Sequence, residues 1–508
     1  MQKNYQNLRR FHKCMSILIL IVLVTISGCK QRTHDPFVEA RAKIKQLMEL
    51  NNIASFQVAV AKDGKLIYEE AFGLADVQEK IPATKETMYQ IASIEKPFVS
   101  TALMMLTERG KINLNAPVNN YLDKEKLIAY QGSASDATVA RLMLHVSGMA
   151  YGYYICNDSI PVEKRRTNTE ILALAGVLVY PPGTEYEYTN YGYGLFGDIV
   201  QKAANGNIKE FITKEIIVPL GLNHTKYFRD EPAKGVIATQ NVKDGYIPFN
   251  LGGDGYSTLY STAGDLARFG MFHLKNHLAG QKPLLSDSSI DLLRTYKEPG
   301  VKYTTRTLAW DIQNDYGYDI IMHGGGGPGI HNYLYIVPSE NLVIAYMSNA
   351  QYASSTPVLL ELLYAAIPDF NFWNQIKGRG WPKYPKIDTK NWKGEWNGQI
   401  SGPKGTCQIS VTFNELGIPK LRINSVNNSD KWIFPNREGQ FNSGKACYRF
   451  DACIPYLLPY AKHDEIIFII KQDGNHIIGS ASAAKEKDFG KDENFVLPQY
   501  IELIKVNQ

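Results

Sequence analysis

The chain has 508 residues, of which 44% are hydrophobic, 21% are charged and 11% are aromatic. This apolar content is ordinary for a globular protein and excludes wholesale disorder or a fibrous chain. The formal net charge of +5, from 55 basic and 50 acidic residues, is too small to indicate a nucleic-acid-binding protein.

The first predicted element is an export signal over residues 1–28. This stretch holds four basic residues and no acidic residue, and an unbroken apolar run lies at 17–24. A basic start, an apolar middle and small residues before a cleavage site are typical of a secretory signal. The run is too short to span a bilayer, which needs about 20 apolar residues. Removing the four basic residues leaves 51 basic against 50 acidic residues, a nearly neutral mature chain.

The end of this signal, Ile26-Ser27-Gly28-Cys29, resembles the bacterial lipobox. In a lipobox the cysteine becomes the lipid-modified first residue of the mature protein. The resemblance implies export and anchoring in the bacterial cell envelope through a lipid on Cys29, with residues 29–36 as a short tether. The alternative is a plain signal peptide followed by an incidental cysteine.

Residues 37–370 are predicted to form an α+β domain. Apolar positions over 37–50 recur with a period near 3.6, which predicts an amphipathic helix. Apolar runs at 56–61 and 66–68 flank Asp63-Gly64, which predicts a hairpin. A mainly helical stretch follows over about 85–300, then strands at 333–337 and 342–346 and a closing helix at 358–367. This order indicates an antiparallel sheet flanked by helices, with a helical insertion.

Residues 371–391 show no clear period and are predicted to be a linker. The region after it, 392–508, is predicted to form a small all-β sandwich or barrel, because short alternating runs recur along it at 407–413, 420–423, 465–470, 477–481 and 501–505.

The cysteines leave one pairing open. Outside the cytosol disulfides can persist, and Cys447 and Cys453 are close enough in sequence to pair across a turn, although geometry decides this. The chain has no CxxC pair and no HExxH motif, so no metal or cofactor site is predicted.

Ser93-Ile94-Glu95-Lys96 is the first motif that carries chemistry. Residues i and i+3 share a helix face, so the amine would lie beside the hydroxyl, and a desolvated lysine can accept a serine proton. The same Ser-x-x-Lys spacing also occurs at 27–30, 401–404 and 482–485, so spacing alone is weak. Ser93 differs because an apolar helical pattern follows it, with Pro97 in the tolerated first turn.

A second motif is Tyr188-Thr189-Asn190. A phenol near an ammonium group can have a lowered pKa and relay a proton, and an asparagine amide can orient a lysine or a substrate. By itself this motif favours a packed loop aromatic over a catalytic residue, and residues 5–7 match the same pattern.

A third motif is the glycine run that follows His323, from Gly324 to Gly327. Small residues on a strand edge let a substrate backbone approach closely, and a free N–H there could stabilise an oxyanion. The alternative is a glycine-rich turn before a strand.

Together and in this order, the three motifs resemble the serine β-lactamase/penicillin-binding-protein superfamily. The similarity is greatest to the branch with class C β-lactamases, D-alanyl-D-alanine carboxypeptidases, D-aminopeptidases and related esterases. Further similarity lies at 142–148, 182–184 and 260–269, so the resemblance covers about 37–367. It implies a β-lactamase/transpeptidase-like fold, and it makes His145, inside 142–148, a structural residue.

The resemblance also assigns roles. Ser93 would be the acylated nucleophile, Lys96 its base and Tyr188 the proton relay. On the substrate side, Asn190 would be a positioning residue and His323 and Gly325 would form the strand motif. The backbone N–H groups of Ser93 and Gly326 would form the oxyanion hole.

One departure from the family pattern bears on the substrate. Many β-lactamases and transpeptidases have lysine where this chain has His323, and an unperturbed histidine is mostly neutral at pH 7, whereas lysine is charged. This favours a peptidase or esterase that acts on peptides or small molecules over a dedicated β-lactamase. A non-catalytic lipoprotein that binds cell-wall ligands is the alternative from another class.

Overall fold

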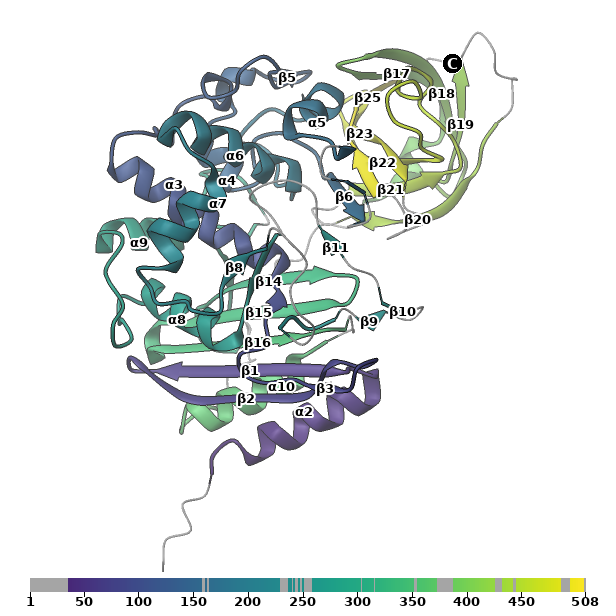
Figure 1. The fold of residues 1–508 in the computed structure, drawn as a ribbon. Helices are drawn as coiled ribbons and strands as arrows, with labels where there is room; N and C mark the ends of the chain where they lie inside the picture. Colours follow the sequence, from purple (N-terminus) through teal and green to yellow (C-terminus); the bar gives the residue numbers. More distant parts are fainter. Residues whose placement is uncertain are drawn as a thin grey trace, which may run out of the picture.

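The computed structural model describes residues 35–157, 160–161, 164–228, 236–239, 241–242, 245–246, 249–250, 258–302, 304–314, 316–350, 354–371, 387–424, 432–441, 445–485 and 494–506. Figure 1 shows a twisted sheet with helices on both faces, a helical region above it and a β domain at the upper right. The predicted export signal, Cys29 and the tether up to residue 34 lie outside the described residues. No described helix is long and apolar enough to cross a membrane.

The central sheet has seven antiparallel strands in the order β13-β14-β15-β16-β1-β2-β3. Their bounds are β1 Ser55–Lys62, β2 Lys65–Asp76, β3 Ile81–Pro82, β13 Asp311–Gln313, β14 Ile320–Gly327, β15 Ile330–Val337 and β16 Leu342–Ser348. Asp63 and Gly64 both have positive φ, 50° and 74°, as the predicted tight hairpin requires. The first strand, β1, pairs with β16 near the other end of the domain, so the sheet joins segments that are far apart in the sequence.

Helices cover both faces of this sheet. On one face, α2 (Val38–Asn51) and α10 (Thr356–Ala366) pack in a shared apolar cluster, and α8 (Ala263–His273) lies on the other. Within its described residues the insertion contains six more α-helices, namely α3 Glu95–Glu108, α4 Val139–Met143, α5 Asn168–Ala175, α6 Asn190–Ala204, α7 Ile208–Ile212 and α9 Asp287–Thr295. The α+β prediction is confirmed, with the antiparallel sheet, the helical insertion and the closing helix all present.

The insertion also contains short strands. Three of them, β4 (Tyr89–Gln90), β12 (Leu259–Ser261) and β8 (Lys226–Tyr227), form a small sheet, and β5 (Ile128–Ala129) pairs with β7 (Val177–Leu178). The remaining short strands are β6 Tyr153–Asn157, β9 Asn241–Val242, β10 Gly245–Tyr246 and β11 Phe249–Asn250.

The C-terminal region is all-β, as predicted. Its strands are β17 Gly394–Gly402, β18 Gly405–Phe413, β19 Pro419–Asn424, β20 Pro435–Phe441, β21 Lys445–Phe450, β22 Glu465–Asp473, β23 His476–Lys485, β24 Asn494–Leu497 and β25 Tyr500–Lys505. Strand β24 also pairs with β6, which places one strand of the helical insertion in the same sheet. The two regions are therefore joined by backbone hydrogen bonds as well as by the segment 372–386, which lies outside the described residues.

The structure shows whether Cys447 and Cys453 form a disulfide. Cys453 is a free thiol, so it forms no disulfide with Cys447, and Cys407 is free as well. Cys453 lies beyond the end of β21, where its Sγ donates a hydrogen bond to the His463 carbonyl oxygen at 2.9 Å, while Cys447 faces Ile469 across the ladder.

Candidate active site

Ser93 lies in a one-turn 3₁₀ helix, Ala92–Ile94, that leads directly into α3. Ala92 has φ +47°, a left-handed conformation that is uncommon for a residue with a Cβ. The surrounding backbone holds this conformation, because the Ile91 N–H donates to the Leu259 carbonyl at 3.0 Å. Strained backbone of this kind concentrates at functional sites, where neighbouring structure over-determines it.

Two side chains converge on the Ser93 hydroxyl. Lys96 Nζ lies 3.0 Å from Ser93 Oγ and Tyr188 Oη lies 2.9 Å from the same atom. Lys96 also donates to Asn190 Oδ1 at 2.8 Å and lies 4.9 Å from the centre of the Tyr188 ring. Residues 95 positions apart in the chain thus meet at one oxygen atom, and four of the predicted site residues form a single cluster.

Burial sets the protonation of this cluster. Lys96 is fully buried, and desolvation, followed by the positive charge of Arg306, lowers its pKa well below the ordinary value. Desolvation raises the pKa of Tyr188, and this outweighs the opposing effect of Arg306. The expectation that a nearby ammonium group would lower the phenol pKa was therefore wrong, because loss of water contributes more than the nearby positive charge.

The Tyr188-Thr189-Asn190 motif is held from behind by His145. The Glu187 N–H donates to the His145 carbonyl at 2.9 Å, and the Thr189 N–H donates to His145 Nδ1 at 3.2 Å. The His145 ring also lies 4.3 Å from the Tyr188 ring. His145 makes no described contact with Ser93, and its contacts are those of a structural residue that supports the Tyr188 motif.

The third motif forms part of β14, beyond the end of its neighbour β13. Pairing with β13 stops at Met322, while β15 continues to pair up to Gly327. The outer edge of Gly324–Gly327 therefore has no partner strand among the described residues, and Gly326 is exposed. An edge of this kind presents backbone N–H groups to a substrate, as the predicted oxyanion contact requires.

Gly325 has a different physical reason to be glycine from the one expected. A Cβ at this position would lie 2.1 Å from the Ile91 carbonyl oxygen, so β14 packs directly against the turn that carries Ser93. Its missing side chain lets the strand approach the turn that contains Ser93. At Gly326, by contrast, a Cβ would meet nothing within 4 Å.

His323 is buried, and its Nδ1 lies 2.9 Å from the Gly324 carbonyl oxygen. Desolvation, followed by the positive charge of Arg306, lowers its pKa well below the ordinary histidine value. His323 is therefore neutral at physiological pH, which agrees with the expectation from its residue type.

Two buried charged residues around the site, Arg306 and Glu95, could not be predicted from the sequence. Arg306 is buried beside the cluster, where it pairs with Asp311 at 3.1 Å and donates to Tyr193 Oη at 3.4 Å. Glu95, next to Lys96, is fully buried and accepts from the Thr258 and Leu259 N–H groups at 2.6 and 3.1 Å. Arg306 places a positive charge near Lys96, Tyr188 and His323 and lowers the pKa of each. Glu95 holds the backbone of Thr258 and Leu259 beside the turn that contains Ser93.

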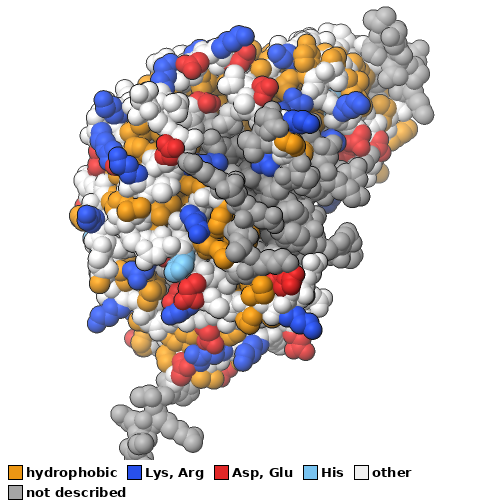
Figure 2. All heavy atoms as spheres, viewed as in Figure 1, with side chains coloured by type: hydrophobic (Ala, Val, Ile, Leu, Met, Phe, Trp, Pro, Cys, Tyr) orange, Lys and Arg blue, Asp and Glu red, His pale blue; other side chains and the backbone are white. Residues whose placement is uncertain are grey.

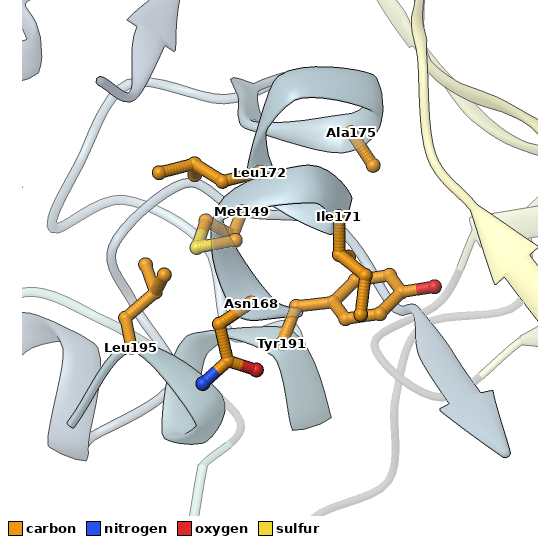
Figure 3. A pocket seen from close by; sticks show the side chains of 7 residues that line it. All are labelled: Met149, Asn168, Ile171, Leu172, Ala175, Tyr191 and Leu195. Atoms are coloured by element: carbon orange, nitrogen blue, oxygen red, sulfur yellow. The ribbon is translucent and has the colours of Figure 1, made fainter. Parts of the chain in front are cut away.

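A small pocket lies between α5 and α6, away from Ser93 (Figure 3). Its lining is Met149, Asn168, Ile171, Leu172, Ala175, Tyr191 and Leu195. Asn168 Nδ2 donates to the Gly194 carbonyl at 2.8 Å, and Tyr191 Oη donates to the Tyr153 carbonyl at 2.5 Å. These polar groups already have partners, so the pocket is a packing gap behind α6 and not a reaction site.

The described surface has mixed charge. On the face drawn in Figure 2, Lys and Arg side chains are interspersed with Asp and Glu side chains over both the α+β domain and the C-terminal domain. This distribution agrees with the nearly neutral composition of residues 29–508.

Comparisons with known proteins agree with the family resemblance of the three sequence motifs. The family model described as Beta-lactamase matches residues 40–366. Protein flp of Staphylococcus aureus (strain MRSA252) is 26% identical over 351 residues, covering 68% of this chain and 69% of that protein. Penicillin-binding protein 4* of Bacillus subtilis (strain 168) is 25% identical over 317 residues, covering 58% and 68%.

Three solved structures share the fold. The octameric penicillin-binding protein homologue from Pyrococcus abyssi covers 92% of this chain and 99% of its own, with a TM-score of 0.56 and 20% identity. SurE, solved with D-Leu, covers 90% and 99%, with a TM-score of 0.59 and 19% identity. The class C β-lactamase from Rhodobacter sphaeroides covers 65% and 98%, with a TM-score of 0.51 and 20% identity. At these identities the structures establish fold alone, and the first two extend into the C-terminal region.

Proposed function

This chain belongs to the beta-lactamase family of serine hydrolases, and from that premise we propose that it cleaves amide or ester bonds through an acyl-enzyme on Ser93. The substrates proposed are D-amino-acid peptides and short-chain esters. The observation that carries the proposal is the meeting of Lys96 Nζ and Tyr188 Oη at Ser93 Oγ, at 3.0 and 2.9 Å, with Lys96 fully buried.

The proposed acylation uses the two neighbours of Ser93 in different roles. Lys96, kept neutral by its lowered pKa, accepts the Ser93 proton as Oγ attacks the carbonyl carbon. The negative charge that develops on the carbonyl oxygen is stabilised by the N–H groups of Ser93 and Gly326. Tyr188, kept protonated by its raised pKa, passes a proton to the leaving nitrogen or oxygen and recovers one from Lys96. The carbon–leaving-group bond breaks and the acyl group stays on Ser93 until water hydrolyses it.

His323 supports the choice of substrate class. A lysine at this place would offer a charge to a substrate carboxylate, whereas the buried, neutral His323 offers only a hydrogen-bonding ring nitrogen. This favours peptides and esters over β-lactams, whose recognition in many relatives uses a cation at the corresponding strand position.

A covalent serine probe tests the nucleophile. A biotinylated fluorophosphonate is expected to label the wild-type protein and not the Ser93→Ala variant. Ser401→Ala is the matched control, because Ser401 has the same Ser-x-x-Lys spacing but lies on β17, where no helix brings Lys404 to its hydroxyl. Equal labelling of the wild type and Ser93→Ala would refute the assignment of Ser93.

A substrate panel tests the finer activity. Purified protein is assayed with D-alanyl-D-alanine peptides, D-amino-acid amides, p-nitrophenyl esters and the β-lactam nitrocefin. The proposal expects kcat/KM to be highest for a peptide, an amide or an ester. Turnover of nitrocefin alone would assign a β-lactamase, and binding of cell-wall fragments without turnover of any substrate would assign a binding protein.

We also propose that the protein is exported and anchored in the cell envelope through a lipid on Cys29, on the basis of the sequence 26–29. Metabolic labelling with an alkyne fatty acid in a bacterial host is expected to mark the wild type and not Cys29→Ser. Labelling of both variants, or of neither, would contradict this site of attachment.

A further inference from the structure

The C-terminal β domain lies against the segment that carries Tyr188. Ile478 and Tyr500 of that domain share an apolar cluster with Val177, Val179 and Tyr180, shortly before the Tyr188 motif. The proposed mechanism uses no residue of the C-terminal domain, so this contact has no assigned role so far.

A buried ion pair crosses this boundary one residue from Tyr188. Lys445 Nζ, from the first residue of β21, pairs with Glu187 Oε1, and the two residues are only 1% and 3% exposed. The Lys445 ammonium also lies 4.2 Å from the centre of the Tyr180 ring and 3.5 Å from Glu185 Oε2. A second pair, between Lys471 and Glu185, joins the same domains nearer the surface.

Such a pair makes one domain depend on the other. A buried carboxylate without a cation either takes up a proton or moves towards water, because an unpaired buried charge is strongly disfavoured. Burial raises the pKa of Glu187, and Lys445 is the main influence that lowers it. If Lys445 were absent, the carboxylate would lose the partner that keeps it charged and in place.

Movement of Glu187 would reach Tyr188 directly. The Glu187 N–H and the Thr189 N–H are both fixed to His145, so Tyr188 is held between two anchored neighbours. The Lys445 contact fixes the side chain of the first of these neighbours from the opposite domain. The 2.9 Å contact between Tyr188 Oη and Ser93 Oγ therefore depends on an anchor outside the hydrolase domain.

The other end of the motif meets the same domain through backbone. The Asn190 N–H donates to the Gly152 carbonyl at 3.2 Å, and Gly152 directly precedes β6, which pairs with β24. A Cβ on Gly152 would lie 2.9 Å from the Val496 carbonyl oxygen of β24, so the two backbones are in close contact there. Both residues that flank Tyr188-Thr189 thus rest on structure supplied by the C-terminal domain.

We propose that the C-terminal β domain completes the active site, with Lys445 as a positioning residue that holds Glu187 and through it the hydroxyl of Tyr188 against Ser93. This inference rests on the proposed function, because it concerns the acylation step at Ser93. It assigns the domain a part in catalysis, by way of one buried lysine, in addition to any role in binding or stability.

The test compares variants of the full chain with the ester or peptide that the panel identifies as substrate. Lys445→Met removes the charge and keeps the length of the side chain. It is expected to lower kcat at least about tenfold while KM stays within about twofold, because a shift of about 1 Å in a catalytic group can lower a rate about a hundredfold. Lys445→Arg, which keeps the charge, is expected to recover part of the loss. Lys471→Met, at the more exposed pair, is the matched control and is expected to keep kcat within about twofold.

A double variant separates positioning from simple stability. Lys445→Met/Glu187→Gln contains no unpaired buried charge, so its melting temperature is expected to return towards that of the wild type while kcat stays low. Recovery of kcat together with the melting temperature would overturn the proposal, as would wild-type kcat in a folded Lys445→Met. If Lys445→Met does not fold, the double variant alone decides between these outcomes.

The two proposals fail in different ways. If the fluorophosphonate does not label wild-type Ser93, the proposed function fails. If the wild type is labelled and Lys445→Met is labelled at the same rate, only the role of Lys445 fails.

Discussion

Gly325→Ala tests how closely the strand motif supports the nucleophile turn. The added Cβ would lie 2.1 Å from the Ile91 carbonyl oxygen, whereas such contacts are essentially never below 3.0 Å. Strand β14 and the turn must therefore separate by about 0.9 Å. Asn332, opposite Gly325 on β15, donates to the Gln90 carbonyl at 2.8 Å and ties the sheet to the segment before the turn. The displacement is therefore expected to fall on residues 91–94, which include Ser93.

The expected effects follow from this displacement. Overpacking a close contact typically lowers the free energy of unfolding by about 1–3 kcal/mol. A shift of nearly 1 Å at the nucleophile is expected to lower the rate of fluorophosphonate labelling about a hundredfold. Urea unfolding, followed by tryptophan fluorescence, measures the first effect, and gel-based labelling time courses measure the second.

Gly327→Ala is the matched control for this prediction. Side chains two residues apart on a strand point to the same side, but a Cβ on Gly327 meets only Ile330 Cδ1, at an ordinary 3.6 Å. Its stability and labelling rate are expected to stay close to those of the wild type. Equal behaviour of Gly325→Ala and Gly327→Ala would refute the reasoning, because the only difference between them is the contact with the Ser93 turn.

Two further predictions concern protonation. Tyr188→Phe removes the hydroxyl that lies 2.9 Å from Ser93 Oγ but keeps the ring packed on His145. The variant is therefore expected to lose about 10²–10⁴-fold in kcat with little change in melting temperature. Retention of kcat would exclude Tyr188 as the proton relay. Acylation requires neutral Lys96, so its rate falls as pH falls. Arg306→Met removes a positive charge that lowers the Lys96 pKa, so the acid limb of the rate–pH profile is expected to move to higher pH. Arg306→Lys keeps the charge and should leave the acid limb where it is in the wild type. If the acid limb does not move in Arg306→Met either, Arg306 does not lower the Lys96 pKa.

The sequence predicted those parts of the fold that have a clean local period. Strands β1, β15 and β16 and helices α2 and α10 all lie where alternating or 3.6-residue patterns placed them. Strand β2 runs on to Asp76, well past the predicted 66–68, because it is only partly buried and its apolar pattern fades. The glycine run of β14 is a strand only because the sheet imposes that structure, since glycine has no preference for it. The pairing of β6 with β24 joins residues more than 300 positions apart, and no local pattern encodes it.

The same distinction applies to the candidate site. Ser93 and Lys96 are three residues apart, so local helical geometry was enough to predict that they meet. Tyr188 and Asn190 required a family resemblance, because nothing local relates them to Ser93. Arg306, Glu95 and Lys445 were missed because a single charged residue in a sequence looks like a solvated surface group. Only the three-dimensional structure shows that all three are buried, with Arg306 and Lys445 in ion pairs and Glu95 hydrogen-bonded to backbone N–H groups.

Burial, helped at Lys96 by the positive charge of Arg306, explains how one cluster can contain both a base and an acid. Removing water disfavours every charged form, so it lowers the pKa of Lys96 and raises the pKa of Tyr188. A neutral amine can accept the Ser93 proton and a neutral phenol can donate one to the leaving group. What the surrounding structure must supply is exclusion of water and fixed distances. Glu95 and β14 fix the distances on the Ser93 side of the cluster, and His145 fixes those on the Tyr188 side. The buried Lys445–Glu187 pair adds a contact from the C-terminal domain that fixes the Tyr188 side further.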